Sequence, residues 1–221
     1  MEDTFFEKNL QCLLCDTKFK ELRVKRSRLK VKKVDTDFAN HTEGPNTIHY
    51  TVSVCPSCGF SFTPQFAPLS ERLRNALKKI MVPPSEDMSG ERTHEQVIYS
   101  FQRAICCSYL TFQKYNVKAA LFLQLAWVHR FAGEEDDELF NLENALDNFV
   151  MLYQEDTEIE QVARTMYLVG ELNRRLGNER EAVKWFSMLI NNHKKESPQL
   201  AKVARERWQE IREVKEENDL L

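Results

Sequence analysis

Two CxxC pairs, separated by 39 residues, constrain the fold of this chain more than any other feature of its sequence. The first pair is Cys12 and Cys15, and the second is Cys55 and Cys58. Two thiolates in one turn can bind a metal ion, and a second such turn completes the four sulfurs that tetrahedral Zn²⁺ prefers. Gly59 follows the second pair, where a turn that curls past a metal needs a residue that tolerates positive φ. The pattern predicts that these four cysteines hold one Zn²⁺ in a zinc ribbon.

Other uses of a CxxC pair stay open. A single pair can be a redox dithiol or two small buried hydrophobes, although redox pairs of the thioredoxin kind lie at a strand-to-helix junction. The 39-residue interval is also longer than usual ribbon spacing. A disulfide framework needs an oxidising compartment, and no secretory pattern precedes Cys12, which favours a cytoplasmic location. Four cysteines already close a structural site, which leaves no position for His41, His49 or a catalytic water.

The segment between the pairs is basic and patterned as strands. In Lys18–Lys33 nine of sixteen residues are Lys or Arg, and only Glu21 is acidic. Apolar residues alternate with charges, and the phase shifts near residues 25–28, which predicts a turn or bulge there. Residues 35–46 are predicted to be a loop and residues 48–54 a strand, giving a ribbon of about three strands. Loop carboxylates are expected to be solvated: Asp35, Asp37 and Glu43.

After residue 66 the sequence takes on the period of helices. Ser70 is a plausible N-cap for a helix that ends before Pro83-Pro84, and residues 83–92 read as a linker. Thr93 and Gln96 have the spacing of a capping box. Cys106 and Cys107 fall inside the helix that follows, and adjacent helical positions cannot easily share a metal. Further helices are predicted over 121–133, 138–153, 157–176 (capped by Thr157-x-x-Glu160), 181–192 and from Ser197-Pro198 onward.

The last helices have features of helical-hairpin repeats. The segment from Tyr167 to Phe186 resembles a tetratricopeptide repeat, in which Gly170 lets two helices approach and Ala182 fills the space opposite. A generic antiparallel helical bundle is the alternative. In a repeat, Asn173 and Arg174 would lie on the concave surface that meets a partner. We therefore predict an α+β protein with two domains: a zinc-ribbon module at 1–66 and a tetratricopeptide-like helical domain at 67–221.

The order of these features resembles a bacterial family that is catalogued only as a domain of unknown function. The similarity rests on the cysteine pairs, on Asp-Thr-Asp-Phe at 35–38, on Gly44-Pro45-Asn46 and on Leu125-Ala126-Trp127 among the helices. It covers nearly the whole chain. What the resemblance implies is a cytosolic, metal-binding bacterial protein, and it implies no reaction.

Composition and motifs narrow the function. The chain has 221 residues and a net charge of −3, with a basic front (residues 1–66) and an acidic back. No apolar run approaches the roughly 20 residues that span a bilayer, and no phosphate-binding loop, HExxH or nucleophile elbow occurs, so we expect neither a membrane protein nor an enzyme. The leading hypothesis is an adaptor that binds a protein partner through its helices, with the oligomeric state left open. The alternative is a nucleic-acid-binding protein whose phosphate contacts are Arg23, Lys25, Arg26, Arg28 and Lys30.

Overall fold

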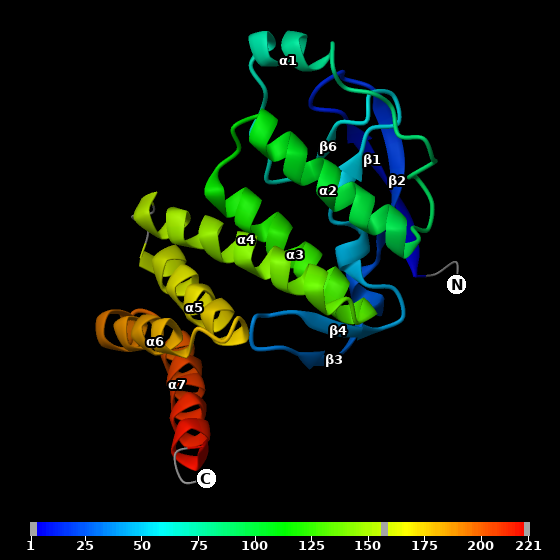
Figure 1. Ribbon diagram of the computed structural model, residues 1–221. Coiled ribbons are helices and arrows are strands. Elements are labelled where there is room, and N and C mark those ends of the chain that lie inside the picture. The colour runs from blue at the N-terminus through cyan, green and yellow to red at the C-terminus, as the bar shows by residue number, and fades with distance from the viewer. Residues whose placement is uncertain (1–3, 156–158, 219–221) are drawn as a thin grey trace. The chain divides into compact units, whose positions relative to one another are not determined.

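The computed structural model describes residues 4–155 and 159–218 of the chain (Figure 1). It divides into two compact units, Met1–Glu138 and Leu139–Leu221. Within the described residues, the first unit contains all the strands and the first three α-helices. The second contains most of the fourth helix and the last three. An α+β layout, predicted from the sequence, is therefore what the chain adopts.

The strands form three separate two-stranded antiparallel sheets. The first joins β1 (Phe5–Gln11) to β2 (Lys18–Val24), with Gln11 opposite Lys18 at the end next to the first cysteine pair. The other two pair β3 (Lys30–Val34) with β4 (Asn40–Glu43), and β5 (Ser53–Val54) with β6 (Ser61–Phe62). The ribbon is thus built from short two-stranded ladders and has twice as many strands as the sequence predicted.

Local signals explain where the strand predictions are right and where they are wrong. The predicted break after β2 is confirmed, because a 3₁₀ turn occupies Arg26–Arg28. The predicted loop at 35–46 contains β4, which pairs back onto β3. The predicted strand at 48–54 is mostly wrong: Asn46 accepts a hydrogen bond from the Ile48 N–H at 3.0 Å and starts a 3₁₀ helix over Thr47–Tyr50. The alternating apolar residues are nevertheless buried as expected: Ile48, Tyr50, Val52 and Val54.

The helices of the first unit begin at the predicted caps. Ser70 accepts a hydrogen bond from the Leu73 N–H at the start of α1 (Glu71–Leu77), which ends earlier than predicted. Thr93 and Gln96 form the predicted capping box of α2 (His94–Leu110). Helix α3 (Tyr115–Ala132) ends at Gly133, whose φ of 77° is the left-handed conformation common after a helix.

One apolar core fills the first unit. It includes the buried residues Cys12, Cys55 and Phe60 and buried residues of α2 and α3 such as Phe101 and Leu121. Cys15 and Cys58 are partly buried and pack against it. The compact units therefore divide at residues 138 and 139, whereas the sequence places a domain boundary at 66 and 67. That residues 1–66 and 67–221 fold as separate domains stays a prediction.

The second unit is a set of helices. Most of α4 (Glu135–Glu155) belongs to it, followed by α5 (Ile159–Arg175), α6 (Glu179–His193) and α7 (Pro198–Asn218). The close approach predicted at Gly170 is confirmed, since a Cβ there would lie 2.6 Å from the Phe186 ring. The predicted cap at Thr157 falls outside the described residues. In the described parts of the chain, no helix combines the length and apolar character that a membrane span requires.

Candidate metal centre

The two cysteine pairs occupy turns of the same design. In the first turn, between β1 and β2, the Asp16 N–H donates to the Cys12 carbonyl at 3.2 Å, and the Cys12 N–H donates to the Thr17 carbonyl at 3.0 Å. In the second, the Gly59 N–H donates to the Cys55 carbonyl at 2.8 Å. Each pair is followed by a residue with positive φ, 62° at Asp16 and 70° at Gly59. The chain therefore curls back past its two sulfurs in both places, as predicted for Gly59.

Packing holds each turn in place. A Cβ on Gly59 would meet the Val82 carbonyl oxygen at 2.0 Å, so only glycine fits there. Arg103 donates a hydrogen bond to the Gly59 carbonyl at 3.3 Å. On the other turn, Arg74 of α1 donates to the Leu14 carbonyl at 3.1 Å and forms an ion pair with Asp16. Side chains from outside the strands thus fix the backbone that presents the thiols.

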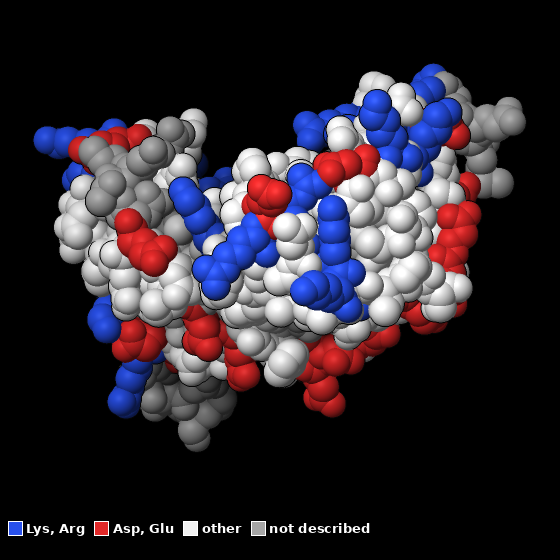
Figure 2. All heavy atoms as spheres, turned by 90° about the horizontal axis from the view of Figure 1, so that it is seen from above, with Lys and Arg blue, Asp and Glu red and all other residues white. Residues whose placement is uncertain are grey.

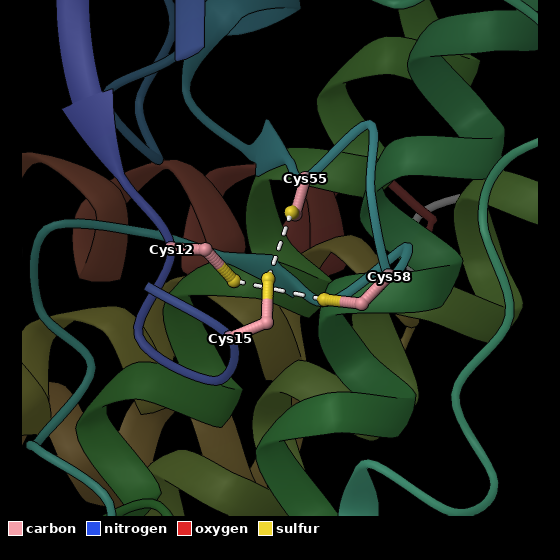
Figure 3. Close-up of side chains that lie close together, drawn as sticks. All are labelled: Cys12, Cys15, Cys55 and Cys58. Atoms are coloured by element: carbon pink, nitrogen blue, oxygen red, sulfur yellow. Dashed lines mark hydrogen bonds between the residues drawn. The ribbon is translucent and has the colours of Figure 1, made fainter. Parts of the chain in front are cut away.

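The four sulfurs converge on one point (Figure 3). The Cys12 and Cys58 sulfurs lie 3.7 Å apart and the Cys15 and Cys55 sulfurs 3.6 Å apart, and all four lie within 4.8 Å of one another. A disulfide requires about 2.05 Å, so neither contact is one. Four sulfurs bound at about 2.3 Å to a tetrahedral ion would lie about 3.8 Å apart. The spacing therefore fits a metal ion among the four thiols.

Hydrogen bonds among the sulfurs shift the pKa values of three of the four thiols. The hydrogen bond with Cys55 raises the pKa of the Cys12 thiol to about 12. Hydrogen bonds from Cys12 and Cys58 lower the pKa of the Cys55 thiol to about 2. The hydrogen bond with Cys12 also raises the pKa of Cys58. The thiolate form is thus favoured at Cys55 and disfavoured at Cys12 and Cys58. Metal ligation requires thiolates, and a divalent ion supplies the compensating charge.

The histidines between the cysteine pairs lie apart from this cluster. His41 contacts Asp35 through Nε2 at 2.8 Å, and burial lowers the pKa of His49. Among the described residues, the groups of side chains spaced to hold a metal include neither. The donor set is therefore four sulfurs, which is closed and leaves no position for a reacting water.

The predicted nucleic-acid contacts do not form one set. Arg23 is largely buried and pairs with Glu21 at 3.0 Å, while also donating to Ser53. Lys25 is half-buried, whereas Arg26, Arg28 and Lys30 are exposed. Arg23 is thus a structural residue, and three of the five remain accessible.

The predicted partner contacts on α5 are not a free surface. Asn173 is only 6% exposed, and its side chain donates to the Val169 carbonyl of its own helix at 2.8 Å. Arg174 pairs with Glu171, which is fully buried. The prediction of these two contacts rests on repeat geometry alone. In the structure, the apolar stripe of α5 places Asn173 inside.

Sequence reasoning missed a buried ion-pair network. Asp37 is fully buried and accepts from Arg130 at 2.7 Å and from the Trp127 indole at 3.0 Å. Arg130 also contacts Asp35 at 3.0 Å and Glu138 at 2.7 Å. Burial raises the pKa of Asp35, but hydrogen bonds from Lys33, His41 and Arg130 outweigh it and hold this pKa well below its usual range. The expectation that the loop carboxylates are solvated is wrong for Asp35 and Asp37, because their partner Arg130 lies 93 positions or more along the chain. Glu43 is exposed, as expected.

Fold and cluster together define a class: an α+β protein with paired cysteine turns, consistent with a zinc ribbon, packed on helices. The chain belongs to the family described as "Uncharacterized protein conserved in bacteria (DUF2225)", whose match covers residues 5–211. No curated protein and no solved structure matches the chain.

Proposed function

We propose that this chain is a non-enzymatic, cytoplasmic adaptor whose cysteine cluster binds one structural Zn²⁺ and whose helices bind a protein partner. The observation that supports this proposal most strongly is the cysteine cluster, in which four sulfurs from two similar turns converge. Zn²⁺ fits because structural zinc sites are tetrahedral and rich in thiolate. Such a closed site stabilises a fold and supplies no reaction.

The partner surface that we propose lies between α6 and α7. A groove of about 260 Å³ is lined there by Ser187, Ile190, Asn191, Arg205, Trp208 and Gln209. Trp208 is half-buried beneath the Arg212 guanidinium, 5.0 Å from its ring centre, while Arg205 is exposed. Tryptophan and arginine are enriched among residues that dominate binding energy. The groove suits a peptide that offers an apolar side chain to Trp208 and a carboxylate to Arg205.

A matched pair of charge reversals on α7 tests this adaptor role. Proteins that co-purify with the full-length chain from its native cells are identified by mass spectrometry, and the affinity of the main partner is then measured. We expect Arg205→Glu to weaken binding at least about tenfold. Lys202→Glu, three residues earlier and also exposed, should leave the affinity unchanged. Equal affinities for the two variants would contradict the proposed surface.

The second candidate function, nucleic-acid binding, is favoured by one observation. All five residues of β3 are exposed, and three are lysines. Together with Arg26 and Arg28 they offer phosphate contacts. On the face that Figure 2 draws, Lys and Arg side chains are interspersed with those of Asp and Glu. Binding of this kind would weaken with salt at a log–log slope of about −0.9 per duplex phosphate neutralised. Loss of nucleic-acid binding in Lys30→Glu, with retention in Lys202→Glu, would favour this function over the adaptor.

A further inference from the structure

A second group of metal-binding side chain types lies where α3 meets α4. The Nδ1 atom of His129 lies 2.6 Å from one carboxylate oxygen of Glu134. The Nε2 atom of His94 lies 2.9 Å and 3.0 Å from the two oxygens of the same carboxylate. A ligand atom of Asp137 lies within 4.8 Å of those of His129 and Glu134. Two imidazoles and two carboxylates thus gather within the first unit.

Local structure brings these residues together. His129 lies in the last turn of α3, and the left-handed Gly133 then reverses the chain, so that the Glu134 N–H donates to the His129 carbonyl at 3.0 Å. Asp137 follows in the first turn of α4. His94 is the first residue of α2, placed by the capping box of Thr93. The group therefore rests on the ends of α2, α3 and α4, and caps fix the backbone at the ends of α2 and α3.

We infer that His94, His129, Glu134 and Asp137 form a binding site for one divalent first-row transition metal ion. Imidazole nitrogen with carboxylate oxygen is a donor set for ions such as Zn²⁺, Mn²⁺ and Fe²⁺, and it differs from the soft sulfur set of the cysteine cluster. Ligand atoms bound at about 2.0–2.2 Å to one ion lie roughly 3 Å apart, close to the His to Glu134 distances.

Exposure of the group indicates how an ion would reach it. The His129 side chain is 5% exposed, whereas the side chains of His94 and Glu134 are 34% and 37% exposed. One ligand is thus held rigidly inside, and the others face solvent. An ion bound there keeps room for water or a small anionic ligand, unlike an ion held by four cysteines.

Mn²⁺ is the probe for this site, because it prefers carboxylate and imidazole ligands and has little affinity for thiolates. The full-length chain, as purified, is titrated with Mn²⁺ alone, and free Mn²⁺ is measured by its electron paramagnetic resonance signal. We expect one saturable site per chain. Glu134→Gln and His94→Gln change partly exposed side chains and should each weaken binding at least about tenfold. Circular dichroism verifies that both variants fold.

The matched control is Asp136→Asn, which removes one exposed negative charge beside the group and should leave the affinity within about twofold. Absence of saturable binding in the unaltered chain would overturn the inference and leave Glu134 as an ordinary ion-pair partner of the two histidines. Equal affinities for Glu134→Gln and Asp136→Asn would overturn it too, since attraction by net charge alone would then explain the binding.

Discussion

At the scale of single residues, burial decides whether a charged side chain is solvated or is part of an ion pair inside the protein. Asp35 and Asp37 lie in a segment that looks like a polar loop, yet both are buried against Arg130. Taking charges out of water costs several kcal/mol per ion, and the loss is recovered only when every partner is present. The cysteines could be predicted because their spacing is local. The Arg130 network could not, since nothing in the sequence near either aspartate points to a residue so far away.

Removing Arg130 should therefore be costly. We expect Arg130→Met to lower the free energy of unfolding by about 3–5 kcal/mol, because the fully buried Asp37 would lose the guanidinium that pairs with it and Asp35 would lose one of its partners. Lys20→Met is the control, since the Lys20 to Glu7 ion pair is exposed and worth at most about 1 kcal/mol. Urea denaturation of both variants measures the difference. Similar losses in the two would mean that the network adds no more than a surface ion pair.

Gly59 and Gly44 separate a backbone effect from a packing effect. Both have positive φ, but a Cβ on Gly44 meets nothing within 4 Å, whereas one on Gly59 meets the Val82 carbonyl. Gly44→Ala should cost about 1–2 kcal/mol, the penalty of a left-handed conformation. Gly59→Ala should cost more and should weaken metal retention, because the second cysteine turn must move. Thermal denaturation and metal content are compared for the two variants. Equal melting temperatures and equal metal contents would show that the second cysteine turn is not tightly packed.

At the scale of elements, the sequence predicted what depends on neighbouring residues. The caps at Ser70 and Thr93 and the break at Arg26–Arg28 are confirmed because the hydrogen bonds concerned close within a few positions. The strand predicted at 48–54 is wrong because alternating burial also suits a 3₁₀ turn, which Asn46 starts. Strand β4 was missed because its polar residues become a strand only by pairing with β3.

The approach of α5 to α6 gives a test at this scale. Gly170→Ala should lower stability by about 1–3 kcal/mol, since the added Cβ would collide with the Phe186 ring. Gly90→Ala is the matched control, because nothing lies within 4 Å of that position. Thermal denaturation compares the two. An unchanged melting temperature in Gly170→Ala would show that α6 shifts freely away from α5.

At the scale of the whole molecule, the cysteine cluster is part of the core of the first unit. The same core includes apolar residues of α2 and α3. Structural zinc contributes about 10–16 kcal/mol in small modules, more than the roughly 5–15 kcal/mol by which most domains are stable. Loss of the metal should therefore affect these helices as well as the strands.

Hydrogen exchange can follow that coupling. After removal of the metal by a strong chelator, we expect backbone amides of α2 and α3 to lose protection. Amides of α5 and α6, which belong to the second unit, should keep theirs. Mass spectrometry of peptides reports both in one experiment. Unchanged protection in α2 and α3 would indicate that the core closes without the metal.

The central claim is that four cysteines hold one Zn²⁺, and the metal-to-protein ratio of the folded full-length chain tests it most directly. The unaltered chain should contain one Zn²⁺ per molecule, and Cys58→Ser should contain almost none. Cys106→Ser removes an exposed cysteine of α2 outside the cluster and should retain the full amount. A folded chain without metal, or equal metal loss in the two variants, would contradict the account.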